Sequence, residues 1–378
     1  MPHGKLENFQ DCEDFVNGCL FMGTGGGGSV SWGMGMLKDA LEEGIALEWV
    51  DVDDIPDDAL TVTAYGMGSI APPSQEALDE IKQLGLVNRF GDRSIEEAVK
   101  ELGKYLGQPI GCLVPAELGA GNSPAPLVAA ARLGIPVVDG DYAGRAIPDE
   151  MQGTPYLYRK NSWPFASVDR WGNVAIVKYT VSPHSLERIG KMLAVAAYGN
   201  TTMAATPLPG KEMKEIVVRG TLTKCLNLGR QMHQAREQGM DPIQAALEAT
   251  GGWRLFEGVV LSKDWEDRGG YMFGTTTIHG TGDYEGQILK VWFKNENHIT
   301  WLNDEPWICS PDIVTLAYKA SGQGITNTLL KAGDQVVAVG IKGLEAFRTH
   351  FGLDEASGPR YFGFDIEYVP IEKLMEAR

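Results

Sequence analysis

A run of glycines near the start of the chain carries the first groups that could do chemistry. Residues 23–28 read Gly-Thr-Gly-Gly-Gly-Gly and stand between two segments with helical patterns, 15–21 and 32–41. Glycine lets bare backbone amides approach a ligand, and Ser29 and Ser31 are candidate N-caps for the second helix. The loop could therefore bind an anion or a developing oxyanion at a helix start. We assign substrate binding to Thr24, Gly25, Gly26, Gly27 and Gly28.

Two other uses of the glycine run have to be weighed. It could be a tight connection between helices, which needs several positive φ values. It could bind a phosphate, but no Lys-Ser or Lys-Thr pair follows it, and a dinucleotide fingerprint must follow a strand rather than a helix. We therefore expect no nucleotide cofactor.

Carboxylates and an amide lie in two further glycine-rich turns, each after a short apolar run. Glu117 and Asn122 lie in the first turn, and Asp139 and Asp141 lie in the second. Crowded carboxylates in a partly dry cleft have separated pKa values, which suits one as a general base and another as an acid, or all as ligands of a cation. We assign catalysis to Glu117, Asp139 and Asp141, and substrate binding to Asn122. The structural alternative is that Asp139 caps a turn and Glu117 pairs with Arg145.

Arg145 and His279 are the remaining candidates. A guanidinium at position 145 could clamp a substrate carboxylate through two parallel hydrogen bonds, or it could hold Asp139 or Asp141. His279 ends a predicted strand and joins Asp141 as a candidate ligand of a divalent metal ion, with a structural histidine as the alternative. The six histidines show no HExxH or His-Cys spacing, so the sequence does not identify a metal.

Composition excludes several classes of partner. The chain has 378 residues, with 50 acidic and 33 basic side chains and a net charge of −17. Nucleic acids and anionic membranes therefore make poor partners. There is no signal-peptide pattern and no apolar run of membrane-spanning length, and the five cysteines form no CxxC pair. We expect a cytoplasmic homo-oligomer with reduced thiols that binds a small cyclic molecule.

The first 165 residues are predicted to form an α/β domain that contains the glycine-rich loop. Helical periodicity is found at 94–106 and 124–133, and short apolar runs typical of buried strands are found at 47–52, 59–65, 110–115 and 135–139. Strands separated by helices predict a mostly parallel sheet with flanking helices. Ligands bind beyond the carboxyl ends of such strands, where the glycine-rich turns lie.

Residues 166–378 are predicted to form an α+β domain. A strand at 174–181 precedes helices at 183–198, 210–218, 221–238 and 241–249. Strand patterns bounded by Gly, Asn and Asp then follow at 255–262, 271–279, 287–293, 299–302, 312–317 and 335–341. Many short strands of this kind are typical of a sandwich or barrel-like region.

Several of these motifs, taken in order, resemble the S-methyl thiohydantoin desulfurase family, which was long known as a domain of unknown function beside hydantoinase and oxoprolinase genes. The resemblance rests on Gly23-Thr-Gly-Gly-Gly-Gly28, Glu117-Leu-Gly-Ala-Gly-Asn122, the stretch 135–148, Lys294-Asn-Glu296 and Ser310-Pro-Asp312. It covers nearly the whole chain. The chain departs from the family's pattern at Ala120-Gly121 and at Tyr142, which would alter the shape of the pocket.

The resemblance implies a hydrolase of hydantoin-type rings. Water would attack C2 of a 2-methylthio-imidazolone, methanethiol would leave and a hydantoin would remain. Asp141 or Glu117 would activate the water, the loop amides would stabilise negative charge, and Arg145 would bind the substrate carboxylate. The alternative is a non-catalytic binding subunit of a hydantoinase or oxoprolinase complex.

Overall fold

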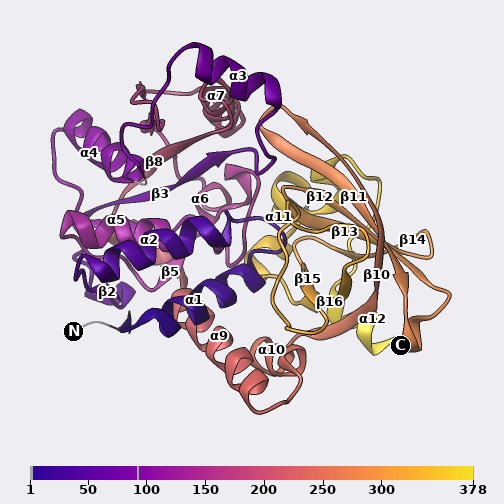
Figure 1. Cartoon of the computed structure of the whole chain (residues 1–378). Coiled ribbons are helices and arrows are strands. Elements are labelled where there is room, and N and C mark those ends of the chain that lie inside the picture. Colours follow the sequence, from indigo (N-terminus) through magenta and orange to yellow (C-terminus); the bar gives the residue numbers. More distant parts are fainter. Residues whose placement is uncertain (1–2, 92, 378) are drawn as a thin grey trace.

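The first of two large sheets joins residues from both halves of the chain. The computed structural model describes residues 3–91 and 93–377. Its five-stranded sheet has the order β4-β3-β8-β6-β7. The strands are β3 (Leu60–Gly68), β4 (Cys112–Val114), β6 (Phe165–Val168), β7 (Val174–Val177) and β8 (Asn200–Pro209). Helices flank it (Figure 1), and the α/β class is confirmed.

This sheet is mixed rather than mostly parallel, which corrects the sequence prediction. β3 pairs with β4 in parallel, and isolated parallel bridges continue this side of the sheet at 113↔137 and 50↔138. On the side away from β4, strand β3 pairs antiparallel with β8, and β8 in turn pairs antiparallel with β6. The cause is β8, whose sequence of small residues and threonines carries only a weak strand pattern. The chain enters it after α7 (Pro183–Ala196) and runs back along β3.

Alternate side chains of β3 face opposite layers of helices. Val62 and Ala64 join the core that contains α4 (Ser94–Leu106) and α5 (Pro124–Leu133). Tyr65 and Met67 join a smaller core with Leu186 of α7. Both faces of this strand are therefore buried, as the sequence pattern predicts.

The second sheet has seven strands and is antiparallel throughout. Its order is β14-β13-β12-β11-β10-β16-β15, and it curves into a half-barrel (Figure 1). The strands are β10 (Trp253–Arg268), β11 (Tyr271–Gly280), β12 (Ile288–Lys294), β13 (Glu296–Leu302), β14 (Glu305–Cys309), β15 (Ile313–Tyr318) and β16 (Gln335–Ile341). The predicted β-rich, barrel-like region is confirmed.

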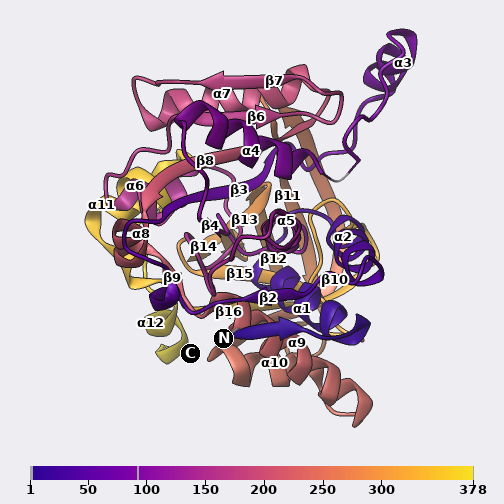
Figure 2. The ribbon, with the colours of Figure 1, turned by 90° about the vertical axis from the view of Figure 1, so that its left-hand side faces the viewer.

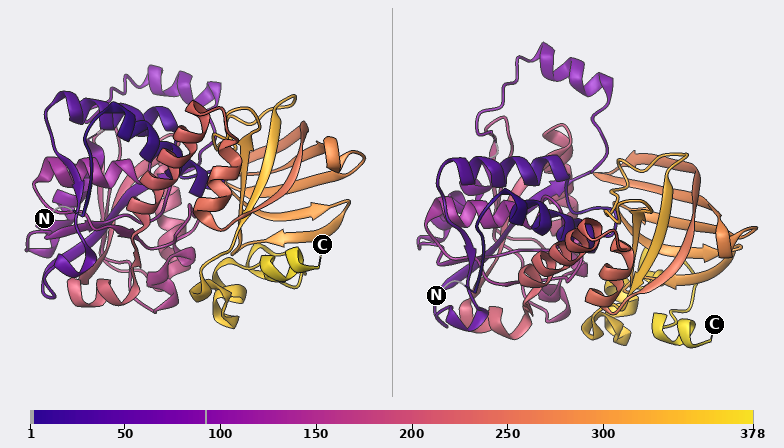
Figure 3. Two further views of the ribbon diagram at one scale, coloured as in Figure 1. Left: turned by 90° about the horizontal axis from the view of Figure 1, so that it is seen from below. Right: turned by 60° about the horizontal axis from the view of Figure 1, so that its bottom comes forward.

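Three helices lie beside the half-barrel (Figure 3): α1 (Phe9–Met22), α9 (Thr221–Glu237) and α10 (Pro242–Thr250). A Cβ atom at Gly18 would lie 1.8 Å from the carbonyl oxygen of Cys225, so glycine is what allows α1 and α9 to approach this closely. The Thr315 hydroxyl of β15 donates to the carbonyl of Phe21 at 2.6 Å. Helix α1 therefore connects the half-barrel to the rest of the molecule.

The remaining elements are short, apart from α2 (Val30–Glu42), which matches the helix predicted at 32–41. They are β1 (Gly4–Leu6), β2 (Leu47–Trp49), α3 (Gln75–Gln83), β5 (Gly140–Asp141), α6 (Thr154–Leu157), α8 (Gly210–Ile216), β9 (Val218–Arg219), α11 (His350–Gly352) and α12 (Ile371–Glu376). Helix α3 projects from the body (Figure 2). The boundary at residue 165 stays a prediction.

All five cysteines are free and buried, as expected for reduced thiols. Within residues 3–91 and 93–377, no helix has the length and apolar character needed to cross a bilayer.

Candidate active site

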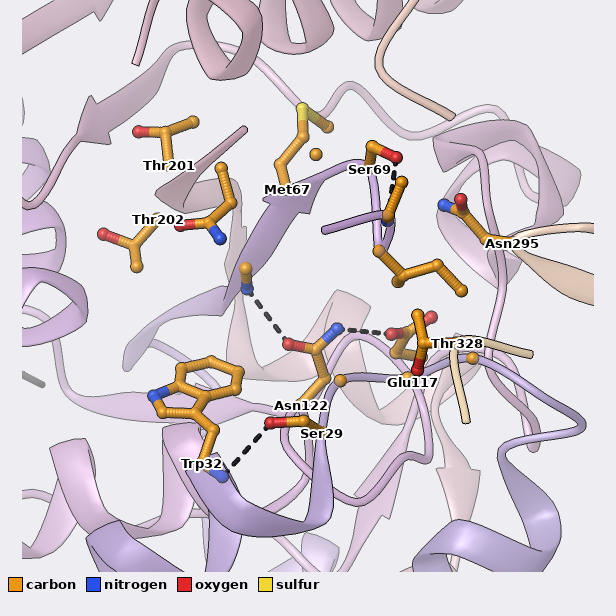
Figure 4. Close-up of a pocket in the computed structure, with 18 of the residues that line it drawn as sticks. Ser29, Trp32, Met67, Ser69, Glu117, Asn122, Thr201, Thr202, Asn295 and Thr328 are labelled. Carbon is orange, nitrogen blue, oxygen red and sulfur yellow. Dashed lines mark hydrogen bonds between the residues drawn. The ribbon is translucent and has the colours of Figure 1, made fainter. Parts of the chain in front are cut away.

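A cavity of about 440 Å³ lies where the α/β part of the molecule meets the half-barrel. Its walls come from the glycine-rich loop, the ends of β3 and β8, the turn after β4 and α7. The half-barrel side supplies Asn295, Glu296, Thr326 and Thr328. In Figure 4 Trp32 lies on one side of this space and Asn295 and Thr328 on the other, with Asn122 and Glu117 between them. The site is therefore built from segments far apart in the sequence.

Glu117 is held by a chain of hydrogen bonds at the centre of the cavity wall. The Asn122 side-chain amide donates to Glu117 Oε1 at 2.5 Å and accepts from the backbone N–H of Gly66 at 3.1 Å (Figure 4). The backbone N–H of Ile147 donates to Glu117 Oε2 at 2.6 Å. Both carboxylate oxygens are thus fixed. Asn122 orients the carboxylate as well as lining the cavity.

Burial is the main influence on the pKa of Glu117. Desolvation raises the pKa of Glu117 to about 7, although the hydrogen bonds from Asn122 and Ile147 favour the ionised form. A carboxylate with a pKa near the working pH suits a general base.

A second carboxyl group, that of Glu296 at the start of β13, lines the same cavity. Its residue is only 2% exposed, and Glu296 Oε2 has no hydrogen-bond partner among the described residues. Desolvation, followed by the nearby charge of Glu117, raises the pKa of Glu296 well above its ordinary value. The two groups cannot both be ionised easily, so Glu296 keeps its proton while Glu117 loses one.

The glycine-rich loop connects α1 and α2 and is fixed from both sides. The half-barrel side donates to its carbonyls, from Asn297 N to Thr24 O at 2.8 Å and from Asn327 N to Gly25 O at 2.7 Å. On the other side, the backbone N–H groups of Gly121 and Asn122 donate to Gly27 O at 3.0 and 3.1 Å. Thr24 and Gly25 therefore anchor the loop and do not line the cavity.

Gly26, Gly27 and Gly28 do line the cavity. Gly27 and Gly28 have φ values of +76° and +87°, which side-chain-bearing residues rarely adopt. Within the described part of the chain, the backbone N–H groups of these two residues have no protein acceptor. Ser29 caps α2 as expected, since its hydroxyl accepts from Trp32 N at 3.2 Å. The loop thus serves as a tight connection and also presents two amides beside the cavity.

Arg145 is buried outside the cavity and holds backbone together. Its guanidinium donates to the carbonyls of Ala146 at 3.0 Å and Asn297 at 2.9 Å, and to the Ser310 hydroxyl at 3.3 Å. Burial lowers the pKa of Arg145 to about 10. In the structure Arg145 joins the half-barrel to the turn after β5 and does not line the cavity, and its binding to a substrate carboxylate stays a prediction.

Asp139 and Asp141 also lie outside the cavity. Asp139 Oδ1 accepts from the backbone N–H groups of Leu222 and Thr223 at 3.0 and 3.1 Å, so it caps α9 from another part of the chain. Asp141 Oδ2 accepts from the backbone N–H groups of Ala143 and Gly144 at 2.8 and 2.7 Å. Burial raises the pKa of Asp141 to about 7. We give neither side chain a part in the chemistry proposed below.

His279 does not join a metal-binding group. It is exposed on β11, opposite Val259 and Ile288. Over residues 3–91 and 93–377, no three His, Cys, Asp or Glu side chains are grouped so that they could hold a metal ion.

Two cations at the cavity were missed by sequence analysis. Lys191 of α7 is only 4% exposed, and its Nζ lies 3.4 Å from the carbonyl oxygen of Gly68 and 3.6 Å from Glu187 Oε1. Arg170 is exposed and donates to Asn200 Oδ1 at 3.2 Å. A signal for Lys191 exists, because Glu187 and Lys191 are spaced i, i+4 on the same helix face as buried Leu186 and Ala194.

Glu296 belongs to the Lys294-Asn-Glu296 motif, but nothing in the sequence places it beside Glu117.

Comparisons with known proteins agree with this architecture. A family model described as "S-Me-THD-like, N-terminal domain" matches residues 10–179, and one described as "S-Me-THD-like, C-terminal domain" matches residues 181–371. An X-ray crystal structure of a protein from Chromobacterium violaceum is similar, with a TM-score of 0.75 and 21% identity over 97% of this chain and 100% of that chain. At this identity the likeness shows the fold alone. No curated protein matches the chain.

Proposed function

Because the chain belongs to the S-Me-THD-like family of S-methyl thiohydantoin desulfurases, we propose that it hydrolyses a 2-methylthio-imidazolone at C2. Methanethiol leaves and a hydantoin remains. One observation carries the proposal: two buried carboxyl groups, those of Glu117 and Glu296, line the same cavity, and burial raises the pKa of each. A carboxylate beside a carboxylic acid is the pair that addition of water to an amidine-like carbon requires.

The first half of the reaction adds water to the ring. Ionised Glu117 takes a proton from water while the water oxygen forms a bond to C2. The electron pair of the C=N bond moves to the ring nitrogen, which takes the proton of Glu296. The product is a tetrahedral intermediate that bears a hydroxyl and a methylthio group.

The second half expels the thiol. The C2 hydroxyl returns its proton to Glu296 as the C=O bond forms and the C–S bond breaks. The leaving methanethiolate takes the proton held by Glu117. Both carboxyl groups regain their starting states, so one water is consumed and one methanethiol is released.

Binding groups for the ring and its substituent surround this pair. The backbone amides of Gly27 and Gly28 are donors for a ring oxygen or an anionic group. Lys191 and Arg170 line the cavity as cations and suit a substrate carboxylate, the role that sequence analysis gave to Arg145. The sequence-based assignment of Asn122 to the site is kept, with the added task of orienting Glu117.

The test measures thiol release from 2-methylthio-imidazolone propionate by the whole protein. Glu117→Gln keeps the shape of the side chain and removes the base, so we expect a loss of kcat of about 10²- to 10⁴-fold. Asp139→Asn is the matched control, a buried carboxylate outside the cavity, and should keep its turnover per folded molecule. Full activity of Glu117→Gln would overturn the mechanism. No turnover by well-folded wild-type protein would favour a binding subunit of a hydantoinase-type complex.

A further inference from the structure

A second, smaller cavity lies against the first and shares Glu117 with it. Its volume is about 50 Å³. The two cavities share Gly66, Met67, Glu117, Ile147 and Lys191 as lining residues. One carboxylate, that of Glu117, therefore borders both the space available to a substrate and the small cavity next to it.

The small cavity is polar, and buried hydroxyl groups without a hydrogen-bond partner among the described residues line it. Thr63 of β3 lines it and is only 2% exposed, yet its hydroxyl has no hydrogen-bond partner among the described residues. Glu150 lines it as well and accepts from the Tyr65 hydroxyl. An unpaired buried hydroxyl is costly in a folded protein unless an ordered water satisfies it.

The size of the cavity matches this requirement. A cavity needs roughly 10–15 Å³ of such volume for one water molecule, so this one, at about 50 Å³, has room for about three to five. Polar partners are present in Thr63, Glu117 and Glu150. Dry cavities, by contrast, are lined by apolar side chains.

We propose that the small cavity is an internal water site that supplies the hydrolytic water to Glu117. The inference rests on the proposed function, because each turnover consumes one water at Glu117 while the substrate occupies the main cavity. A water that enters from the small cavity reaches Glu117 without passing the substrate. Thr63 is then a positioning residue that holds this water, and no bond changes in the transfer.

The first experiment is structural and does not depend on activity. A high-resolution crystal structure of the whole protein is expected to show ordered water in the small cavity, within hydrogen-bond distance of the Thr63 hydroxyl. A cavity without ordered water in wild-type crystals would overturn the inference, whatever the enzyme turns over.

The second experiment removes the hydroxyl and keeps the shape. Thr63→Val should lower kcat about tenfold with KM unchanged, as the loss of one hydrogen bond to the reacting water predicts, and Thr63→Ser should restore it. The matched control is Thr61→Val on the same strand, since the Thr61 hydroxyl is bonded to the carbonyl of Leu208 and lines neither cavity. Unchanged kcat in Thr63→Val, with wild-type turnover intact, would overturn the water site and leave the proposed function standing.

Discussion

Two carboxyl groups that line one cavity determine how the site ionises. Both Glu117 and Glu296 are buried, and desolvation is the largest cause of the raised pKa of each. They differ in what else they contact, since Glu117 accepts hydrogen bonds from Asn122 and Ile147 whereas Glu296 Oε2 has no partner among the described residues. The same burial therefore yields a base and an acid.

The pH dependence of turnover should report this pair. We expect kcat/KM to rise with pH through about 7 as Glu117 loses its proton, and to fall at higher pH as Glu296 loses its own. Asn122→Leu removes a hydrogen bond that favours the ionised form of Glu117, so the rising limb should move to higher pH. Steady-state kinetics on the thioether substrate measure both effects. A rising limb that stays in place in Asn122→Leu would contradict the assignment of that limb to Glu117.

About half of the site residues proposed from the sequence line the cavity. Glu117 and Asn122 could be named because glycine-rich turns after apolar runs mark the ends of buried strands. Residues 26–28 could be named because consecutive glycines before a helix start expose backbone amides. Asp139 and Asp141 share the same local pattern but face elsewhere. Asp139 caps a helix whose amides are 83 and 84 residues away in the chain, a contact that only tertiary structure creates.

At the scale of elements, the glycine-rich loop is shaped by its neighbours as much as by its own flexibility. A Cβ atom at Gly26 would lie 1.8 Å from Glu296 Oε1, although Gly26 itself has no positive φ. The glycine is therefore needed there for space. It lets the acid at the start of β13 lie directly against the loop.

Adding one methyl group at Gly26 should show whether glycine is needed there for space or for the flexibility of the loop. Gly26→Ala should displace the Glu296 carboxyl and lower kcat by at least about 100-fold, because acid catalysis contributes roughly that much. Gly35→Ala in α2 is the matched control, since a Cβ there meets nothing within 4 Å, and it should keep activity and gain up to about 1 kcal/mol of stability. Turnover and thermal unfolding of both variants provide the measurement. Comparable activity in the two variants would be incompatible with the assigned role of Gly26.

Elements were predicted better than their pairing. The helices α4 and α5 match the predicted ranges 94–106 and 124–133, because both have clear helical periodicity. Strand β8 was missed because threonine and alanine fill most of its buried positions, so it has neither a long apolar run nor a strict alternation of apolar and polar residues. Without β8 the sheet was expected to be mostly parallel. Pairing depends on contacts between segments far apart in the chain, which local periodicity does not encode.

At the scale of the whole molecule, the cavity exists only when both halves of the chain are folded together. Asn297 and Asn327 of the second half hold the glycine-rich loop of the first, and Arg145 donates across the same junction. Burying carboxyl groups at such a junction makes the stability of the folded protein depend on pH. Burial raises the pKa of Glu117, Asp141 and Glu150 to about 7 each.

These three groups should make the folded state less stable as pH rises. Their ordinary pKa values are 4.5, 3.8 and 4.5, so from about pH 4 to pH 7 the folded protein binds more protons than the unfolded chain, and the free energy of unfolding falls with increasing pH across that window. Each unit of upward shift corresponds to about 1.4 kcal/mol. Urea denaturation should therefore give a lower midpoint at about pH 8 than at about pH 5.5. Asp141→Asn can still accept the two backbone hydrogen bonds but cannot ionise, so its loss of stability over this range should be smaller.

The control is Asp264→Asn, which removes one exposed charge from a chain of net charge −17 and leaves the buried groups unchanged. If Asp141→Asn and Asp264→Asn lost stability equally between the two pH values, repulsion among surface charges, and not buried carboxyl groups, would be the cause.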